Sequence, residues 1–448
     1  MIDPSAVSED EVNRTPTPVG ERPHVVIVGA GFGGLACAQA LGGSTVRVTV
    51  VDRQNYHLFV PLLYQVATTA LAPADIAEPI RRVLNRYHNV DVVLGEVAAV
   101  DAGQRRVKLA DGGFLPYDRL VLATGSTQNY FGHEQWADVA PALKTIEDAR
   151  IVRTRLLMAF EQAEICPDEV QRVRLMTTVI VGGGPTGVEL AGAVAELARF
   201  TLARDFRRID PRMARIVLIE AGQRLLPTFP EALSDYARGE LQRLGITILL
   251  GQGVERIGAD GVTVGGQEIP AGTVIWAAGV RASPAARWLQ VEADRAGRIR
   301  VDNDLSVPAC AGVYALGDTA LFLDRNGQAL PGLAQVAKQQ GNHLGQALAA
   351  SLLHGTPMPP FRYRDRGNAA IIGRSAAVFD FGRRRLKGWL AWLLWAVVHV
   401  YLLVGVENRL AVSLKWLWRY LTYESGSRLI ADAKPGALDQ TDRCHPGR

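Results

Sequence analysis

Residues 26–34 read VIVGAGFGG, and this stretch decides the fold of the chain. An apolar strand comes first, and Gly29, Gly31 and Gly34 follow at the spacing of a dinucleotide-binding turn. The first glycine permits a tight turn, the second lets the backbone approach a pyrophosphate, and the third lets a helix pack close to the sheet. Asp52 closes the next apolar run, where an acid accepts hydrogen bonds from ribose hydroxyls. The stretch therefore predicts a strand, a turn and a helix N-terminus that hold one pyrophosphate.

A second stretch repeats this pattern further along the chain. Its glycines Gly182, Gly184 and Gly187 follow an apolar strand in the sequence VIVGGGPTG, and Glu220 closes the next apolar run. One such unit binds one dinucleotide. Two units in one chain predict two dinucleotides held together, and the usual reason is the transfer of a hydride between them.

The second acid also bears on the choice of nucleotide. Glu220 should repel a 2′-phosphate, which favours NADH over NADPH, although Arg224 lies close enough to leave NADPH open. The interval between the glycines and Glu220 is longer than in the first unit. We expect the extra residues to form a surface insertion within 199–213.

Composition sets the broad class of the protein. The chain has 448 residues, enough for two or three domains, and 48% hydrophobic residues with 45 glycines suit an α/β protein. A net charge of +4 does not indicate a nucleic-acid partner. The histidines do not cluster and the cysteines show no metal-ligand spacing, so we expect no metal and a reducing compartment. The four cysteines are Cys37, Cys166, Cys310 and Cys444.

The rest of the chain contains terminal segments and three further strands. Residues 1–22 and 431–448 lack an apolar core and are expected to be loose. Apolar strands that end in small residues are expected at 120–125, 274–279 and 313–318. The order of glycine turn, acid and strand occurs twice, which predicts two related nucleotide-binding halves.

This order of motifs resembles the flavoproteins with two dinucleotide-binding domains. The resemblance implies an α/β fold with two Rossmann-like domains, in which an NADH domain (131–279) interrupts an FAD domain (23–130 and 280–360). It also implies a membrane-anchoring helical region over 361–430. The FAD-binding positions that it implies, besides the glycines and Asp52, are Val97, through its backbone at the adenine, Ala123, Thr124 and Gly125 along the flavin, and Asp318 at the ribityl chain. Gly279 ends the matching strand of the second half and is a further cofactor-binding position.

Three stretches narrow the resemblance to one family. They are NYHLFVPLLYQVA at 55–67, AQVAKQQG at 334–341 and the apolar, Trp-rich C-terminal segment. Together they resemble the type II NADH dehydrogenases, which are non-pumping NADH:quinone oxidoreductases. The resemblance implies non-covalent FAD, NADH as substrate, and a respiratory reaction in which a hydride passes to FAD and two electrons then pass to ubiquinone or menaquinone.

Four polar residues are candidates for the chemistry. Gln335 and Gln339 are four apart, so they share one helix face and can bond quinone oxygens, unless they form only a solvated face. Glu189 is expected in the first helical turn after Gly187, either complementing the helix dipole or relaying protons to quinone. Lys387 matches a quinone-pocket lysine of the family, or is one more basic residue at a membrane surface.

Three residues near the first acid are candidates for the walls of the site. His57, Phe59 and Tyr64 lie in the family-specific stretch and are expected to line the flavin or quinone channel. For Phe59, structural packing is the expected role.

The C-terminal segment predicts membrane attachment. Residues 388–406 carry no Asp, Glu, Lys or Arg, although His399 lies at their centre, and the stretch meets the length of about 18 residues that a spanning helix needs. Residues 410–423 mix Trp and Tyr with Lys415 and Arg419, a composition that suits an interface with anionic headgroups. A spanning helix, a surface helix and a helix buried in a dimer all remain open. The resemblance favours monotopic attachment to the cytoplasmic face of the membrane, and we expect a homodimer.

Two other functions remain open. A sulfide:quinone oxidoreductase shares the fold but needs two cysteines beside the flavin, and Cys166 and Cys310 are the only plausible pair. A membrane-bound NADH or FAD sensor needs no turnover, whereas Gln335 and Gln339 favour an enzyme.

Overall fold

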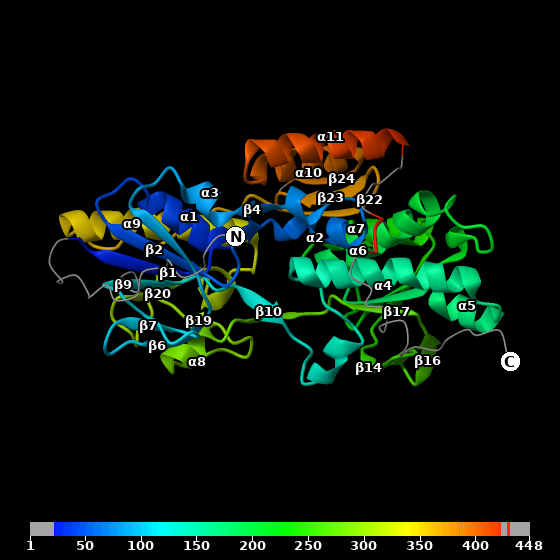
Figure 1. Cartoon of the computed structure of the whole chain (residues 1–448), viewed down its shortest axis with the longest axis horizontal. Helices are drawn as coiled ribbons and strands as arrows, with labels where there is room; N and C mark the ends of the chain where they lie inside the picture. Colours follow the sequence, from blue (N-terminus) through cyan, green and yellow to red (C-terminus); the bar gives the residue numbers. More distant parts are fainter. Residues whose placement is uncertain (1–21, 383, 423–427, 431–448) are drawn as a thin grey trace, which may run out of the picture. The chain divides into compact units, whose positions relative to one another are not determined.

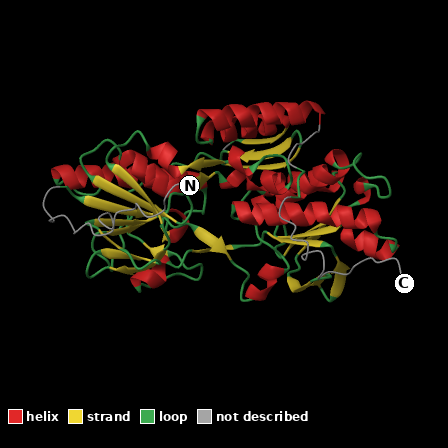
Figure 2. Ribbon diagram, in the orientation of Figure 1, coloured by secondary structure: helices red, strands yellow, loops and turns green. Residues whose placement is uncertain are grey.

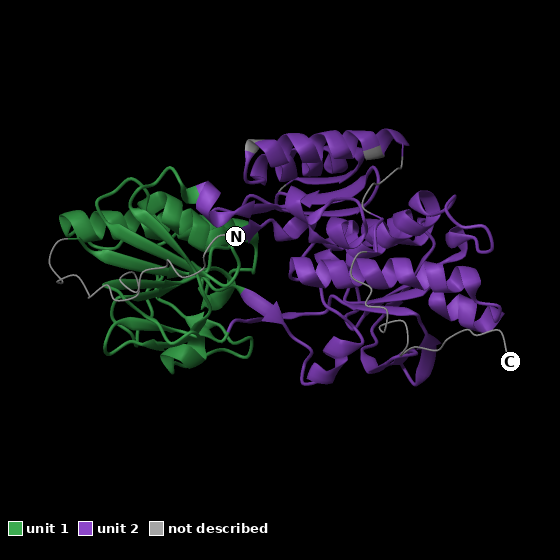
Figure 3. Cartoon of the chain, in the orientation of Figure 1, with its two compact units in different colours: residues 1–55, 84–125, 284–363 green, residues 56–83, 126–283, 364–448 purple. Residues whose placement is uncertain are grey.

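The computed structural model describes residues 22–382, 384–422 and 428–430, and the chain divides into two compact units (Figure 3). Unit 1 comprises Met1–Asn55, Leu84–Gly125 and Pro284–Tyr363. Unit 2 comprises Tyr56–Val83, Ser126–Ser283 and Arg364–Arg448. The predicted terminal arm, apart from its last residue, and the predicted tail lie outside the described residues.

Unit 1 contains a parallel five-stranded sheet (Figure 1). Its order is β20 (Val313–Ala315), β9 (Arg119–Leu122), β1 (His24–Val28), β2 (Arg47–Asp52) and β5 (Val90–Leu94). The inner strands β9, β1 and β2 are buried over most of their length, as is typical of a parallel sheet that is covered on both faces. Unit 1 also contains an antiparallel sheet of β6 (Val97–Asp101), β7 (Arg106–Leu109) and β8 (Phe114–Pro116).

Two helices of unit 1 pack through small residues. They are α1 (Phe32–Leu41), which follows the first glycine turn, and α9 (Ala334–His354). A Cβ added at Gly341 would lie 2.1 Å from the carbonyl oxygen of Gly33, and one added at Gly345 would lie 2.6 Å from that of Cys37. The glycines of α9 therefore allow its backbone to touch the helix that begins at the turn.

Unit 2 contains a parallel four-stranded sheet of the same type. Its order is β13 (Ile246–Leu250), β12 (Arg215–Glu220), β11 (Thr177–Val181) and β17 (Thr273–Trp276). The unit also holds α4 (Ile146–Ile165), α5 (Glu169–Leu175), α6 (Pro185–Glu196), α7 (Glu231–Arg243) and the antiparallel strands β14 (Val254–Gly258), β15 (Gly261–Val264) and β16 (Gln267–Pro270). The two Rossmann-type sheets and the three later strands predicted from sequence are confirmed.

The long interval before Glu220 has a structural cause. After α6 the chain makes a π-helical turn at Leu197–Thr201 and then an irregular loop before β12. The carboxylate of Glu164, in the last turn of α4, accepts N–H bonds of 3.0–3.1 Å from Arg207, Arg208 and Ile209. The predicted insertion is therefore present, and one acid side chain fastens it.

The C-terminal part of unit 2 consists of a small sheet and two helices (Figure 2). Strands β22 (Asn368–Gly373), β23 (Ala376–Asp380) and β24 (Arg385–Gly388) are antiparallel, and α10 (Trp389–Leu402) and α11 (Val406–Thr422) follow. The apolar stretch 388–406 is thus a helix that stops at Leu402, followed by a short connection. Among the described residues we find no helix with both the length and the apolar character to cross a membrane.

Helix α11 is tied to the protein by polar side chains. The ammonium of Lys415 bonds both carboxylate oxygens of Asp75 at 2.6 and 2.7 Å, while its side chain stays 46% exposed. Asn408 bonds Glu78, and both acids are buried in the segment that runs from β3 (Tyr56–Leu58) through α2 (Leu63–Ala67) and β4 (Ala77–Pro79) to α3 (Ile80–Leu84). Two polar side chains of α11, Asn408 and Lys415, therefore bond buried acids of the protein, and composition alone does not reveal these contacts.

Candidate functional site

The first glycine turn has the geometry that a pyrophosphate requires. Gly29 has a φ of +99°, and a Cβ there would lie 2.4 Å from the carbonyl oxygen of Ala123. A Cβ at Gly34 would lie 1.8 Å from the carbonyl oxygen of Gly29. The helix can therefore approach the turn this closely only because residue 34 has no side chain. A Cβ at Gly31 would meet nothing within 4 Å. The turn is thus closed toward the protein and open on the side where a phosphate would approach.

The second glycine turn repeats this geometry in unit 2. Gly182 has a φ of +115°, and a Cβ there would lie 2.6 Å from the backbone of Ala277. A Cβ at Gly187 would lie 1.8 Å from the carbonyl oxygen of Gly182, whereas one at Gly184 would meet nothing within 4 Å. Both turns therefore fit a dinucleotide.

Each acid at the end of the second strand also holds its own turn. The carboxylate of Asp52 accepts N–H bonds from Ala30 at 2.6 Å and Gln54 at 2.8 Å. The carboxylate of Glu220 accepts N–H bonds from Gly183 and Gly222, both at 2.6 Å. The acids predicted to face ribose hydroxyls are thus fixed in position by the backbone of the turns.

The other predicted FAD positions surround the carboxyl ends of the strands of unit 1. Ala123, Thr124 and Gly125 follow β9, and the hydroxyl of Thr124 lies 3.1 Å from that of Thr319, the neighbour of Asp318. Val97 is buried at the start of β6. The structure thus places residues 124 and 319 together, although they are far apart in sequence.

Sequence reasoning missed one glutamine of α9. Gln340 is 1% exposed, and its side-chain oxygen accepts the N–H of Gly317 at 2.7 Å, which fixes the turn before Asp318. Gln335 and Gln339 share a helix face as predicted and remain half-buried. One signal for Gln340 is present in the sequence, which is its position next to Gln339. The next residue of a helix points in another direction, and at Gln340 this direction is toward the core.

Glu189 lies in an apolar setting rather than at the helix end. It is the fifth residue of α6, past the first turn, so the expectation that it complements the helix dipole there is wrong. Burial raises the pKa of its carboxyl to about 8, against a weak opposing effect of the Ile371 N–H, which lies 3.5 Å from Oε1. The carboxyl is therefore neutral at pH 7 and can donate a hydrogen bond.

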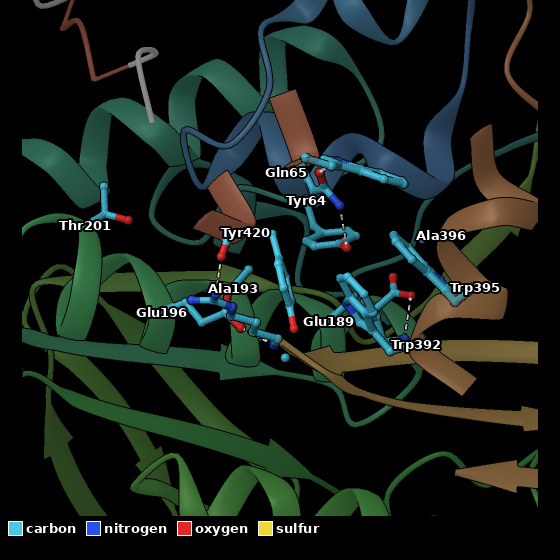
Figure 4. A pocket seen from close by; sticks show the side chains of 14 residues that line it. Tyr64, Gln65, Glu189, Ala193, Glu196, Thr201, Trp392, Trp395, Ala396 and Tyr420 are labelled. Atoms are coloured by element: carbon cyan, nitrogen blue, oxygen red, sulfur yellow. Dashed lines mark hydrogen bonds between the residues drawn. The ribbon is translucent and has the colours of Figure 1, made fainter. Parts of the chain in front are cut away.

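A pocket in unit 2 contains the accessible surface of Glu189 (Figure 4). Its open space is about 720 Å³, including the solvent at its mouth. Aromatic rings form much of the wall, together with a few polar side chains from α2, from α6 and from the turn after β22. The lining residues are Tyr64, Gln65, Glu189, Ala193, Glu196, Thr201, Ile371, Gly373, Arg374, Trp392, Trp395, Ala396, Trp416 and Tyr420. Such walls suit a flat, mostly apolar ligand with a few polar atoms.

The remaining predicted residues of unit 2 divide into wall, core and surface positions. Tyr64 lines the pocket, and Phe59 is buried against His399, which confirms its packing role. His57 is buried in β3. Lys387 is exposed on β24 with its ammonium 5.3 Å from the ring centre of Tyr236, and it is not among the lining residues.

Gly279 was predicted from its place after a strand. A Cβ there would lie 2.7 Å from the tip of the Phe131 ring, which is 61% exposed and would have to turn away. Strand β18 (Val280–Ala282), which follows it, pairs with β10 (Ser126–Gln128).

Comparison with known proteins identifies related chains. Residues 23–341 match the sequence profile of the pyridine nucleotide-disulphide oxidoreductase family. The chain is 40% identical to the type II NADH:quinone oxidoreductase Ndh of Mycobacterium tuberculosis over 96% of its own length and 95% of that protein. It is 30% identical to the type II NADH:quinone oxidoreductase of Haemophilus influenzae over 79% of its length and 86% of that protein.

Solved structures share the fold. The NDH2 of Plasmodium falciparum, in complex with NADH, matches with a TM-score of 0.83 at 22% identity, over 92% of this chain and all of that one. The sulfide:quinone oxidoreductase of Aquifex aeolicus matches with a TM-score of 0.66 at 20% identity, over 86% of this chain and 92% of that one. At these identities the likeness concerns the fold alone.

Proposed function

The chain belongs to the type II NADH:quinone oxidoreductases, and on that premise we propose how its residues divide the reaction. It is an enzyme that uses FAD, oxidises NADH and reduces a quinone. Bound FAD supplies the chemistry, because it accepts a hydride from NADH and returns two electrons to the quinone. The residues of the chain bind and orient the partners and supply protons.

We propose that the first turn holds FAD and the second holds NADH. Open space at Gly31 and Gly184 supports this placement, because backbone N–H groups at a helix N-terminus attract a pyrophosphate. The carboxylates of Asp52 and Glu220 are held at the ends of β2 and β12, and an acid at this position of such a unit accepts hydrogen bonds from ribose hydroxyls. Val97, Ala123–Gly125, Asp318 and Gly279 are proposed to contact the nucleotides at their predicted places.

The quinone is proposed to enter the aromatic pocket beside Glu189. The observation that carries this proposal is that Glu189 lines a space walled by aromatic rings, where burial raises the pKa of its carboxyl to about 8. A protonated carboxyl donates to a quinone oxygen and can release that proton as the oxygen gains electron density. Gln335 and Gln339, which share one face of α9 in unit 1, are proposed to bond quinone oxygens on the resemblance alone. Lys387 is proposed to assist from β24, on the resemblance alone.

Separate measurement of the two half-reactions tests this assignment. In Glu189→Gln, NADH should bleach the flavin at the wild-type rate, whereas reoxidation by a soluble quinone should slow by about 10²-fold, a typical loss for a proton donor. Glu161→Gln, an exposed acid on α4, is the matched control and should leave both rates unchanged. Wild-type reoxidation in Glu189→Gln would remove Glu189 from the reaction.

The outer faces of α10 and α11 are proposed to lie on a lipid surface. Leu410, Leu414, Leu417 and Leu421 recur on one side of α11 and are 56–69% exposed. An amphipathic helix with such a face lies in the plane of a membrane interface. Exposed Arg384, Arg385 and Lys387 just before α10 suit anionic headgroups, which supports monotopic attachment to the cytoplasmic leaflet.

Sedimentation with vesicles that contain phosphatidylglycerol tests the lipid surface. Leu414→Glu with Leu417→Glu should leave the protein in the supernatant, whereas Leu353→Glu on α9, a partly exposed leucine of unit 1, should not. If the double variant still sediments with vesicles but changes from dimer to monomer in solution, the face is covered by a second copy instead. A homodimer formed through another surface stays our prediction. The mass of the wild-type protein in solution tests it.

A further inference from the structure

Gln65 connects two walls of the aromatic pocket through a fully oriented amide. It is 4% exposed, and its Oε1 accepts the indole N–H of Trp416 from α11 at 2.8 Å. Its Nε2 donates to the hydroxyl oxygen of Tyr64 at 2.8 Å, the bond drawn between these two residues in Figure 4. Because an indole nitrogen can only donate, the oxygen of the amide must face Trp416. The amide therefore has one orientation.

Trp416 begins a stack of rings that returns to the segment containing Gln65. Its ring stacks on that of Trp395 of α10, with 5.3 Å between the ring centres. The Trp395 ring stacks in turn on that of His399, with 4.1 Å between the ring centres. The rings of His399 and Phe59 form a T-shaped pair with 6.1 Å between their centres. Burial lowers the pKa of His399 to about 4, so the ring stays neutral and the stack carries no charge at pH 7. The stack of Trp416, Trp395, His399 and Phe59 is thus held at both ends by residues 59–65.

Two members of this stack are also pocket walls. Trp395 and Trp416 line the space that Glu189 faces, and Gln65 itself lines it. The opposite side of α11 carries the exposed leucines Leu414 and Leu417, so this helix joins the pocket to the outer surface. A change in the tilt of the Trp416 ring would alter the width of the space for a flat ligand.

We infer that Gln65 is a positioning residue for the quinone, which sets the walls of the pocket by holding the rings of Trp416 and Tyr64. The inference rests on the proposed function of this pocket. Gln65 takes no proton and transfers no electron. It acts through Trp416, and its loss should weaken quinone binding without touching the reaction of NADH with the flavin.

A double-mutant cycle in the FAD-loaded enzyme tests the inference. Gln65→Met keeps the length of the side chain and removes the amide, and Trp416→Phe keeps a ring and removes the N–H. Each should raise the KM for a short-chain soluble quinone about five- to tenfold, the size of one lost buried hydrogen bond. The double variant should show no larger rise than either single variant, and NADH should bleach the flavin at the wild-type rate throughout.

A binding measurement without turnover accompanies the kinetics. Quenching of tryptophan fluorescence by the same quinone in the absence of NADH should show a weaker Kd in Gln65→Met, in proportion to its KM. Trp136→Phe, which trims a buried tryptophan in the core of the β11–β12–β17 sheet, is the control for lost stability and should leave both constants unchanged. An unchanged quinone KM in Gln65→Met, or additive rises in the double variant, would overturn the inference.

A variant that fills the pocket separates this inference from the proposal on which it rests. Ala396→Phe places a ring in the space, and Val397→Phe places one on the exposed side of the same helix. If Ala396→Phe leaves the quinone KM unchanged, the pocket is not the quinone site and the proposed function of the pocket fails. If Ala396→Phe raises the KM while Gln65→Met does not, the role of Gln65 alone is refuted.

Discussion

The two glycine turns have nearly the same backbone but differ at one inner position. Ala30 follows the first glycine in unit 1, and Gly183 follows it in unit 2. Each N–H bonds the acid of its own unit at 2.6 Å. A Cβ at Gly183, however, would lie 2.7 Å from Leu225 and 2.8 Å from Glu220. The same hydrogen bond therefore leaves room for a methyl group beside Asp52 but not beside the longer Glu220.

The helices after the two turns differ more strongly. Two residues beyond the third glycine stand Ala36 in α1 and Glu189 in α6. The first helix packs against glycines of α9, whereas the second packs against β22, where a Cβ at Gly192 would lie 1.7 Å from the carbonyl oxygen of Ile372. The two turns are thus alike, and the units differ in the element that covers the helix and in the residue two positions past the third glycine. Five predictions test this comparison.

The largest effects should come from the third glycine of each turn. In Gly34→Ala and Gly187→Ala a Cβ would lie 1.8 Å from a backbone oxygen, so the turn cannot keep its shape. Gly34→Ala should yield a colourless protein. Gly187→Ala should stay yellow while bleaching by NADH is lost. Absorbance at the flavin bands before and after NADH distinguishes them, and the opposite pairing of losses would exchange the nucleotides assigned to the two units.

The inner position should give the next largest effect. Gly183→Ala forces Glu220 and Leu225 to move, and we expect the KM for NADH to rise roughly tenfold, equivalent to about 1.4 kcal/mol. Ala30→Gly removes only a methyl group and should leave flavin content unchanged. Adding Glu220→Asp to Gly183→Ala copies the pair found in unit 1 and should recover part of the loss. A wild-type KM in Gly183→Ala would show that the contact relaxes freely.

Glu189, which has no counterpart in α1, should give a pH-dependent effect. Quinone reduction should fall about tenfold per pH unit above 8, because the donor form of the carboxyl is lost, and Glu189→Gln should remove this dependence. Glu196 and Arg374 line the same pocket, so each is tested by a neutral variant. A profile in Glu189→Gln that still falls at pH 8 would assign the titration to another group.

The same group makes a second measurement possible. The carboxyl ionises near its usual value of 4.5 in the unfolded chain but only near 8 in the fold, so the folded state binds the proton more tightly. Stability should therefore fall as pH rises from about 4.5 to 8 and level off above. Thermal unfolding of the wild type against Glu189→Gln isolates this contribution, because the glutamine cannot ionise.

The sequence predicted the turns and strands because their signals are local. Gly29 and Gly182 report a backbone conformation, and Asp52 and Glu220 lie at the end of the next strand. The pocket could not be predicted in this way, since Gln65 and Trp416 meet only after the chain has folded. The two sides of an amphipathic helix pose the same difficulty, because leucines that face out and leucines that face a core have the same spacing.

The smallest expected effect concerns the choice between NADH and NADPH. Glu220→Gln keeps a side-chain oxygen for one of the two backbone N–H groups and removes the negative charge that opposes a 2′-phosphate. The KM for NADH should rise about twofold and that for NADPH should fall by a similar factor, since one exposed charge contributes about 1 kcal/mol or less. Asp52→Asn changes the corresponding acid of unit 1 and should alter flavin retention but not the ratio of the two constants. An equal shift of both constants in Glu220→Gln would mean that the acid only holds the turn, and that its bonds to Gly183 and Gly222 are its whole role.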